Sequence, residues 1–522
     1  MTRMRCVWVV SALVLSAALV WVALPERTQG PNVLIVVWDT VRRDHLSLYG
    51  HPKPTTPALE QWAKDAVVFE NARSPAIWTL PAHASLFTGL PPPTTGADER
   101  WLWLDGAHET LAERFSARGY RTFSFAANAL LSPETQLVQG FDVIMNTWRG
   151  KARAKAERLT KLKLLPSDRS NELSPGWKPP DHGAHNAEWA RAVYKDAAPL
   201  IVDTFLRWVD ERDDGRPFFA YLNLMEAHTP RIPSAASRSA VMSPELAELA
   251  LATDAAHIRL HFYNFGQQEY TDAEIDAIRG VYDAALRDLD TATQALISGL
   301  SDRDKLNDTI VVLTSDHGEN LGDHHLFNHR FALWDSLLRV PLLIRYPAAL
   351  PAGRVAEPVS TLDLFATLVA LCGLGDAPPS SQSLVNRDTP RGPVISWMAS
   401  PLAREIETVK AVHPDVAVEP WIRSGEAVAV GSRVFIRYST GEASAYDLEV
   451  DPGQLAPLPP ESSLAAALNQ ALAAVIPYDP TRRGPKDRPG HTRASGTDFQ
   501  DALQALGYTT PEPAELPLNP GI

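Results

Sequence analysis

The stretch NVLIVVWDT, residues 32–40, decides the fold. A continuous apolar run that ends in a polar pair is typical of a strand buried on both faces of a parallel sheet. A similar run, TIVVLTSD, fills residues 309–316 after a predicted helix over about 272–300, and residues 109–128 read as a helix, a stop at Gly119 and a strand. This alternation predicts an α/β fold with a large, mostly parallel sheet between layers of helices.

Polar residues end two of these predicted strands. Asp39 closes the first, and Asp316 and His317 close the strand over 309–316. Ligands of parallel α/β sheets bind at the carboxyl ends of strands. Divalent cations bind carboxylate oxygens together with an occasional imidazole, so these residues are candidate metal ligands. A helix cap or a solvated loop would also explain each aspartate taken alone.

Residues 78–89, WTLPAHASLFTG, predict a helix that begins at Thr79, because Pro81 and good helix formers follow it. An ordinary threonine cap is one interpretation. The other is functional, because a helix N-terminus offers free N–H groups to an anion. A threonine hydroxyl held there on a metal ion can ionise and attack phosphorus or sulfur.

Changes in composition predict the domain boundaries. Residues 31–378 form the expected catalytic domain, which contains a basic insertion over 148–180. That insertion presents either a solvated helix face or a contact for anionic headgroups or substrate. Residues 379–478 form a smaller α+β domain, and residues 479–522 a proline-rich tail with a terminal helix.

Two segments predict strands in the smaller domain. They are AVAVGSRVFIRYS, residues 427–439, and ASAYDLEV, residues 443–450. Each is rich in β-branched and aromatic residues, so we expect one strand from each segment, paired as a hairpin-like antiparallel unit.

The N-terminus predicts a membrane anchor within residues 1–30. An apolar run from Cys6 to about Leu24 follows two arginines, and its length suits a bilayer-spanning signal anchor. A cleaved signal peptide is the alternative. Either interpretation places the catalytic domain on the extracytoplasmic side, in the periplasm or at the cell surface.

Composition excludes some classes of function. The chain has 522 residues, of which 45% are hydrophobic and 21% charged, which is a globular balance. The formal net charge of −13 argues against nucleic-acid binding but not against an anionic substrate, because the local field decides that. The two cysteines, Cys6 and Cys372, fit neither an internal disulfide nor a zinc motif.

Taken together, the segments resemble the sulfatase-like branch of the alkaline phosphatase superfamily. Residues 32–50 are similar to the opening strand and its aspartate, 78–89 to the nucleophile motif C/S/T-x-P-S-x-x-x-L-x-T-G, and 314–329 to the metal motif. Further similar segments follow in the family's order: 109–122, 222–230, 340–347, 360–368, 443–454 and 503–508. The resemblance therefore implies the fold of that family.

The resemblance also implies a metal site. Asp39, Asp316 and His317 would bind one divalent ion, and Thr79 would complete the set. The ion would be Mn, Mg, Ca or Zn, because two aspartates and one histidine accept all of these.

The resemblance places four further residues at the substrate. His228 matches the histidine of a His-x-Pro segment, which contacts the substrate's charged group or leaving oxygen. His329 stands where relatives carry a lysine or histidine near the anion, and His324 matches a recurrent position of less clear role. Asn128 ends a predicted strand and would line the pocket. A structural role is the alternative for each of them.

Three departures from the pattern bear on the chemistry. Sulfatases oxidise a cysteine or serine to formylglycine, whereas the Cβ of Thr79 carries a methyl group, so no formylglycine is expected. The serine and arginine of C-x-P-S-R are Ala82 and His83 here, and the aspartate after the first metal ligand is Thr40. These changes favour relatives that use threonine directly as the nucleophile.

The sequence thus predicts a metal-dependent hydrolase or transferase of phosphate-type esters, diester or monoester, that acts through a covalent Thr79 intermediate. Water or a second alcohol would release the bound group. The expected partner is an anionic ester, with a membrane or envelope origin as a further hypothesis. The alternatives are a sulfuric ester hydrolase without formylglycine and an inactive, membrane-tethered binding protein on the same scaffold.

Overall fold

The computed structural model describes most of the chain. It covers residues 30–150, 197–211, 213–255, 257–386, 390–401, 403–459, 462–473, 499–500 and 502–503. The predicted N-terminal helix, most of the basic insertion and most of the tail lie outside the described residues.

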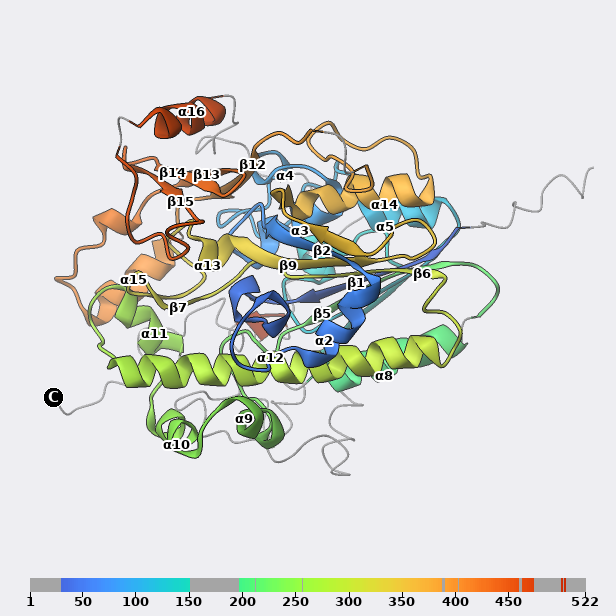
Figure 1. Cartoon of the computed structure of the whole chain (residues 1–522), viewed down its shortest axis with the longest axis horizontal. Helices are drawn as coiled ribbons and strands as arrows, with labels where there is room; N and C mark the ends of the chain where they lie inside the picture. Colours follow the sequence, from blue (N-terminus) through green and yellow to red (C-terminus); the bar gives the residue numbers. More distant parts are fainter. Residues whose placement is uncertain are drawn as a thin grey trace, which may run out of the picture.

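Within the described residues, nine strands form one large sheet in the order β10-β2-β9-β6-β1-β5-β3-β4, with β11 beside β2 (Figure 1). Its strands are β1 (Asn32–Trp38), β2 (Val67–Arg73), β3 (Arg121–Ala126), β4 (Val143–Asn146), β5 (Phe218–Leu224), β6 (Thr309–Thr314), β9 (Arg339–Arg345), β10 (Gly353–Val355) and β11 (Val359–Ser360).

The sheet is mostly parallel, as the sequence predicts. Strand β1 pairs in parallel with β5 and β6, and β3 pairs in parallel with β5 and β4. Strand β9 runs antiparallel to both β2 and β6, which makes the sheet mixed. Every residue of β1 from Val33 to Trp38 is buried, because the strand has neighbours on both sides and helices above and below.

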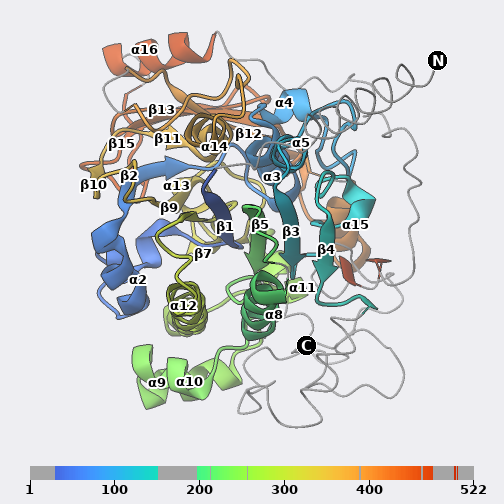
Figure 2. The same cartoon turned by 90° about the vertical axis from the view of Figure 1, so that its right-hand side faces the viewer.

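Helices cover both faces of this sheet. Figures 1 and 2 show α12 and α8 on one face and α3, α5 and α14 on the other. In the described part of the chain the α-helices are α2 (Pro57–Trp62), α3 (Thr79–Thr88), α4 (Pro92–Thr95), α5 (Leu111–Ala117), α8 (Ala198–Glu211), α9 (Ala235–Val241), α10 (Pro244–Ala252), α11 (His257–Asn264), α12 (Asp272–Ser301), α13 (Asp335–Leu338), α14 (Leu364–Cys372), α15 (Ala403–Val412) and α16 (Ser463–Leu472).

A smaller antiparallel sheet follows in the order β12-β13-β14-β15, packed against α16. Its strands are β12 (Val394–Met398), β13 (Gly425–Val430), β14 (Arg433–Tyr438) and β15 (Ala443–Asp447). The prediction of one strand over residues 427–439 is wrong. The chain reverses at Gly431, whose φ of 59° lies in the left-handed region that favours glycine, and the segment forms two paired strands.

The structure corrects the prediction of a membrane anchor. No helix within the described residues is both long and apolar enough to cross a bilayer. The 30-residue helix α12 has the length, but acidic and basic residues recur along it, and a charged helix is not stable in the hydrocarbon core. The apolar run from Cys6 lies outside the described residues.

Asp283 on α12 anchors the loop that follows β1 to this helix. Its buried carboxylate accepts hydrogen bonds from His45 Nδ1 and Lys53 Nζ, both at 2.7 Å, and lies 3.4 Å from His51 Nε2. Burial alone would raise the pKa of Asp283. The hydrogen bonds from the two histidines, and the charges of His45 and Lys53, instead hold that pKa well below its ordinary value of 3.8.

We expect Asp283→Asn to lower the free energy of unfolding by about 3 kcal/mol, because Lys53 loses its buried counter-ion. Since the folded-state pKa is depressed, the carboxylate stabilises the protein above about pH 4, and this contribution is lost as the pH falls below that value. Urea unfolding at a series of pH values should therefore show a weaker acid dependence in the variant.

Asp203→Asn is the control for this variant. Asp203 pairs with Arg207 at 2.9 Å on the exposed side of α8, where ion pairs contribute less than about 1 kcal/mol. Equal losses of stability in the two variants would show that Asp283 does not have the anchoring role.

Candidate active site

The candidate site lies at the carboxyl ends of the central strands. Asp39 follows β1, Asp316 and His317 follow β6, Asn128 follows β3, and His228 lies in the loop after β5. Because these strands are parallel neighbours, their ends meet at one edge of the sheet. Donor atoms of Asp39, Asp316 and His317 lie within 4.8 Å of one another, and all three residues are buried.

Two asparagine side chains hold one oxygen of Asp39. Its Oδ2 accepts hydrogen bonds from Asn128 Nδ2 at 2.8 Å and from Asn223 Nδ2 at 3.0 Å. Its Oδ1 is buried and has no hydrogen-bond partner within the described part of the chain. Burial, followed by the charge of Asp316, raises the pKa of Asp39 to about 7.

Asp316 has the same arrangement of one bound and one unbound oxygen. Its Oδ1 accepts from the backbone N–H of Thr40 at 3.2 Å and of His317 at 3.0 Å. Its Oδ2 is buried, and no described residue donates a hydrogen bond to it. Burial raises the pKa of Asp316 to about 7.

His317 completes a donor set that fits a divalent cation. Burial lowers the pKa of His317, so the ring is neutral, and its Nδ1–H donates to the Gly318 carbonyl at 2.9 Å. Its Nε2 lone pair then lies 3.4 Å from Asp316 Oδ2 and 3.4 Å from Thr79 Oγ1. Two unbound carboxylate oxygens and an imidazole nitrogen need a positive charge between them, and they suit Mn, Mg, Ca or Zn.

Thr79 is the first residue of α3, as its sequence context predicts. Trp78 caps the helix in an extended conformation, and every residue of the helix is buried. The Oγ1 of Thr79 lies 3.3 Å from Asn128 Nδ2, close to the metal donor set. The hydroxyl is therefore at the positive end of a helix and beside both carboxylates.

His83 fixes the first turn of α3. Burial lowers the pKa of His83 to about 3, so its ring is neutral. Its Nδ1 donates to the Thr79 carbonyl at 2.8 Å, which leaves Nε2 to accept from the Tyr221 hydroxyl at 2.6 Å. The ring thus connects the turn that carries Thr79 to strand β5.

A row of histidine rings leads away from the metal donor set. The ring centroids of His317 and His329 are 4.5 Å apart, and those of His329 and His228 are 5.3 Å apart. His228 Nδ1 donates to the Thr229 carbonyl at 2.6 Å. His329 Nδ1 lies 3.3 Å from Glu319 Oε1, and burial is the main reason that the pKa of His329 is far below its ordinary value.

Three side chains of this site are absent from the sequence predictions. Asn223 binds Asp39, His83 holds the turn at Thr79, and Glu319 pairs with Arg231 at 2.9 Å behind His329. Asn223 is the polar residue of the otherwise apolar strand FFAYLNL, and that contrast was an available signal.

The structure places His324 apart from the other predicted residues. The hairpin of β7 (Asn320–Asp323) and β8 (Leu326–Asn328) carries His324 at its turn. The ring stacks on Trp334 with centroids 4.0 Å apart, rather than on the histidine row. In contrast, Asn128 contacts both Asp39 and Thr79.

Thr40 has a strained backbone conformation beside the metal donor set. Its φ is 62°, in the left-handed region, which a β-branched residue rarely adopts. Its carbonyl accepts from the Tyr282 hydroxyl at 2.8 Å, while its N–H donates to Asp316. These two bonds hold the conformation in spite of its cost.

A second group of possible metal donors is His45, His51 and Asp283. Here the Lys53 ammonium already lies 2.7 Å from the carboxylate and neutralises its charge. Among the residues that the structure describes, no comparable cation lies at the unbound oxygens of the first group, so that group is the better candidate for a metal ion.

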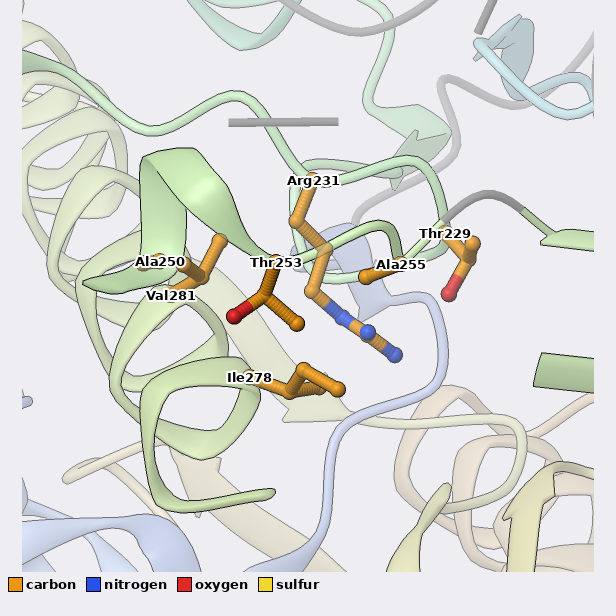
Figure 3. A pocket seen from close by; sticks show the side chains of 7 residues that line it. All are labelled: Thr229, Arg231, Ala250, Thr253, Ala255, Ile278 and Val281. Atoms are coloured by element: carbon orange, nitrogen blue, oxygen red, sulfur yellow. The ribbon is translucent and has the colours of Figure 1, made fainter. Parts of the chain in front are cut away.

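A cavity of about 20 Å³ lies next to the loop that carries His228 (Figure 3). It has room for about one water molecule and is too small for an ester substrate. Its lining residues are Thr229, Arg231, Ala250, Thr253, Ala255, Ile278 and Val281. None of the residues of the metal donor set lines this cavity.

Comparison with known proteins agrees with this architecture. The sequence model of the family described as "Sulfatase" matches residues 31–374. The chain is 28% identical over 355 residues to an ulvan-active sulfatase of Formosa agariphila, a match that covers 66% of this chain and 62% of that protein.

Two further proteins are similar. A multifunctional alkaline phosphatase superfamily protein, PehA, of Trinickia caryophylli is 25% identical over 391 residues, which cover 66% of this chain and 74% of that protein. The crystal structure of a phosphonate monoester hydrolase of Agrobacterium radiobacter superposes with a TM-score of 0.65 at 21% identity, over 85% of this chain and 94% of the other. At this sequence identity, the similarity to the phosphonate monoester hydrolase shows the fold alone.

We expect Mn²⁺ to stabilise the wild-type protein by about 2.7 kcal/mol at a free concentration of roughly 100 times its Kd. Asp316→Asn should lose this stabilisation, because it removes one of the two unbound carboxylate oxygens. In metal-free buffer the variant should be at least as stable as the wild type, since it also removes one of two buried like charges. Thermal unfolding with and without Mn²⁺, after treatment with a chelator, measures both effects.

Asp283→Asn is the matched control, because it alters the second donor group and leaves the first intact. Mn²⁺ should stabilise this variant as much as it stabilises the wild type, although the variant is less stable than the wild type in metal-free buffer. If Asp283→Asn abolished the Mn²⁺ effect and Asp316→Asn kept it, the metal would bind at the second group.

Proposed function

The chain belongs to the sulfatase family of hydrolases, within the alkaline phosphatase superfamily, and we propose that it hydrolyses phosphate-type esters through a covalent intermediate on Thr79. The observation that carries the proposal is the position of Thr79 Oγ1, at the start of a buried helix and 3.4 Å from His317 Nε2. A threonine cannot be oxidised to formylglycine, so its own hydroxyl is the available nucleophile.

The metal donor set supports the activation of this hydroxyl. A divalent cation bound by Asp39, Asp316 and His317 would lower the pKa of the Thr79 hydroxyl and offset the negative charge of the ester. Asn128 donates to Asp39, and its Nδ2 lies 3.3 Å from Thr79 Oγ1. It would therefore fix the position of the carboxylate relative to the hydroxyl.

In the proposed first step the Thr79 oxygen attacks phosphorus, and the bond from phosphorus to the leaving alkoxide breaks. The positive end of the α3 dipole would stabilise the negative charge on the remaining oxygens. His83 would hold that turn in place through the Thr79 carbonyl. The product of this step is a phosphothreonine.

His228 would protonate the leaving group. Its Nδ1–H is directed at the Thr229 carbonyl, so the proton that the protonated ring gives up is the one on Nε2. In the second step the neutral ring accepts a proton from water, the water oxygen attacks phosphorus, and the bond to Thr79 breaks. The phosphate product leaves, and the Thr79 oxygen, which releases its proton to solvent before the first step, takes a proton back from solvent.

The comparisons support both a phosphorus and a sulfur substrate. One solved structure with a similar fold is a phosphonate monoester hydrolase, another is a 2-O GAG sulfatase, and a sequence relative is an ulvan-active sulfatase. Sulfuric ester hydrolysis is therefore the second candidate, and it would have to use Thr79 without formylglycine. Thr79 itself is the reason to prefer the phosphorus substrate.

We expect Thr79→Ala to reduce kcat by roughly 10³-fold or more on an aryl phosphodiester, because it removes the nucleophile. Thr79→Ser should retain part of the activity, since it keeps the hydroxyl. Thr88→Ala is the control on the same helix, because Thr88 is buried and donates only to the Ala84 carbonyl at 2.6 Å. Rapid quenching and mass spectrometry should find one phosphoryl group on the peptide that carries Thr79.

An aryl phosphodiester, an aryl phosphomonoester and an aryl sulfate should be assayed side by side with Mn²⁺. Turnover of the phosphate esters above that of the sulfate would agree with the proposal. Turnover of the sulfate alone would establish the second candidate. Full activity of Thr79→Ala on every ester would contradict the assignment of the nucleophile.

A further inference from the structure

Arg330 lies beside the proposed nucleophile, although no step above uses it. It directly follows His329 in the chain, and Trp78, whose ring it covers, directly precedes Thr79. The guanidinium carbon is 4.9 Å from the centroid of the Trp78 ring. Only 14% of the Arg330 side chain is exposed. An arginine is thus fixed next to two residues of the candidate site.

One end of the Arg330 side chain is anchored and the other is not. Its Nε lies 3.1 Å from Glu405 Oε1 on α15. Its Nη1 is buried and has no hydrogen-bond partner within the described residues. A buried N–H group of a cation is costly to leave unbonded, so an acceptor from beyond the described residues is expected at this nitrogen.

The charge of Arg330 acts on the candidate site. Burial is the main cause of the low pKa of His317 and of His329, and the positive charge of Arg330 lowers both further. Burial also raises the pKa of the nearby Glu99 to about 8, so at neutral pH this carboxyl is protonated and does not cancel the arginine. The guanidinium is therefore paired with Glu405 on one side and has no anion at Nη1 within the described residues.

We propose that Arg330 binds a charged oxygen of the substrate ester through Nη1 and so selects for the charge of the substrate. This inference rests on the proposed function, because it assumes that the ester binds at Thr79. Trp78 and Glu405 orient the guanidinium, and the planar fork directs its N–H groups. A substrate with two charged oxygens gains more from this contact than one with a single charge.

Inorganic phosphate is the probe, and its binding to the full-length, Mn²⁺-loaded protein is measured by titration calorimetry. Arg330→Gln should weaken phosphate binding roughly tenfold or more, and Arg330→Lys should recover part of the loss. The ratio of kcat/KM for an aryl phosphomonoester to that for a diester should fall in Arg330→Gln, mainly through KM. The Mn²⁺-induced thermal shift should remain, which shows an intact fold and metal site.

Arg423→Gln is the matched control. Arg423 also lies over an aromatic ring, that of Tyr438 at 3.7 Å, and pairs with Glu442, but it lies two residues before β13 of the smaller sheet. It should leave phosphate binding unchanged. Glu405→Gln removes the anchor and keeps the guanidinium, so phosphate affinity should stay within a few-fold of wild type. A purely structural Arg330 would make Glu405→Gln and Arg330→Gln behave alike.

Wild-type phosphate affinity in a folded Arg330→Gln protein would overturn the inference, whatever the outcome for Thr79. Lost phosphate affinity in Arg330→Gln, combined with full turnover by Thr79→Ala, would instead contradict the proposed nucleophile and leave the role of Arg330 in place. The two proposals therefore fail in different experiments.

Discussion

Two carboxylates buried side by side at neighbouring strand ends are the constraint on which this structure depends. Strand β1 lies between β5 and β6, and this pairing brings Asp39 and Asp316 together at one edge of the sheet. Neither carboxylate reaches water, and each keeps one oxygen without a hydrogen bond from the described residues. Like charges in such a place are tolerated only if protons or a cation offset them.

The surrounding groups are arranged around this charge. The side chains of Asn128 and Asn223 donate to Asp39, and backbone N–H groups donate to Asp316. Burial keeps the imidazoles of His317 and His83 neutral, so that each has one donor and one acceptor nitrogen in a fixed direction. These neutral hydrogen-bond donors orient the two carboxylates but do not offset their negative charge. A bound ligand must therefore supply the positive charge.

The fold was predictable where a local sequence pattern agrees with the overall architecture. The apolar run of β1 has a single interpretation, and Thr79 before Pro81 predicts a helix start, which the structure confirms. The turn at Gly431 was missed because β-branched residues continue on both sides of it. Asn223 was missed although it interrupts an otherwise apolar strand. His83 could not be assigned from the sequence, because a polar residue in a helix becomes informative only when its partner is known.

The strained backbone at Thr40 has a consequence for how this sequence can change. Glycine would adopt the φ of 62° without strain, whereas threonine adopts it at a cost of roughly 1–3 kcal/mol. Glycine would keep both backbone hydrogen bonds, to Tyr282 and to Asp316, but it would allow the peptide that follows Asp39 to move more easily. Stability and rigidity of the donor set therefore favour different residues at position 40.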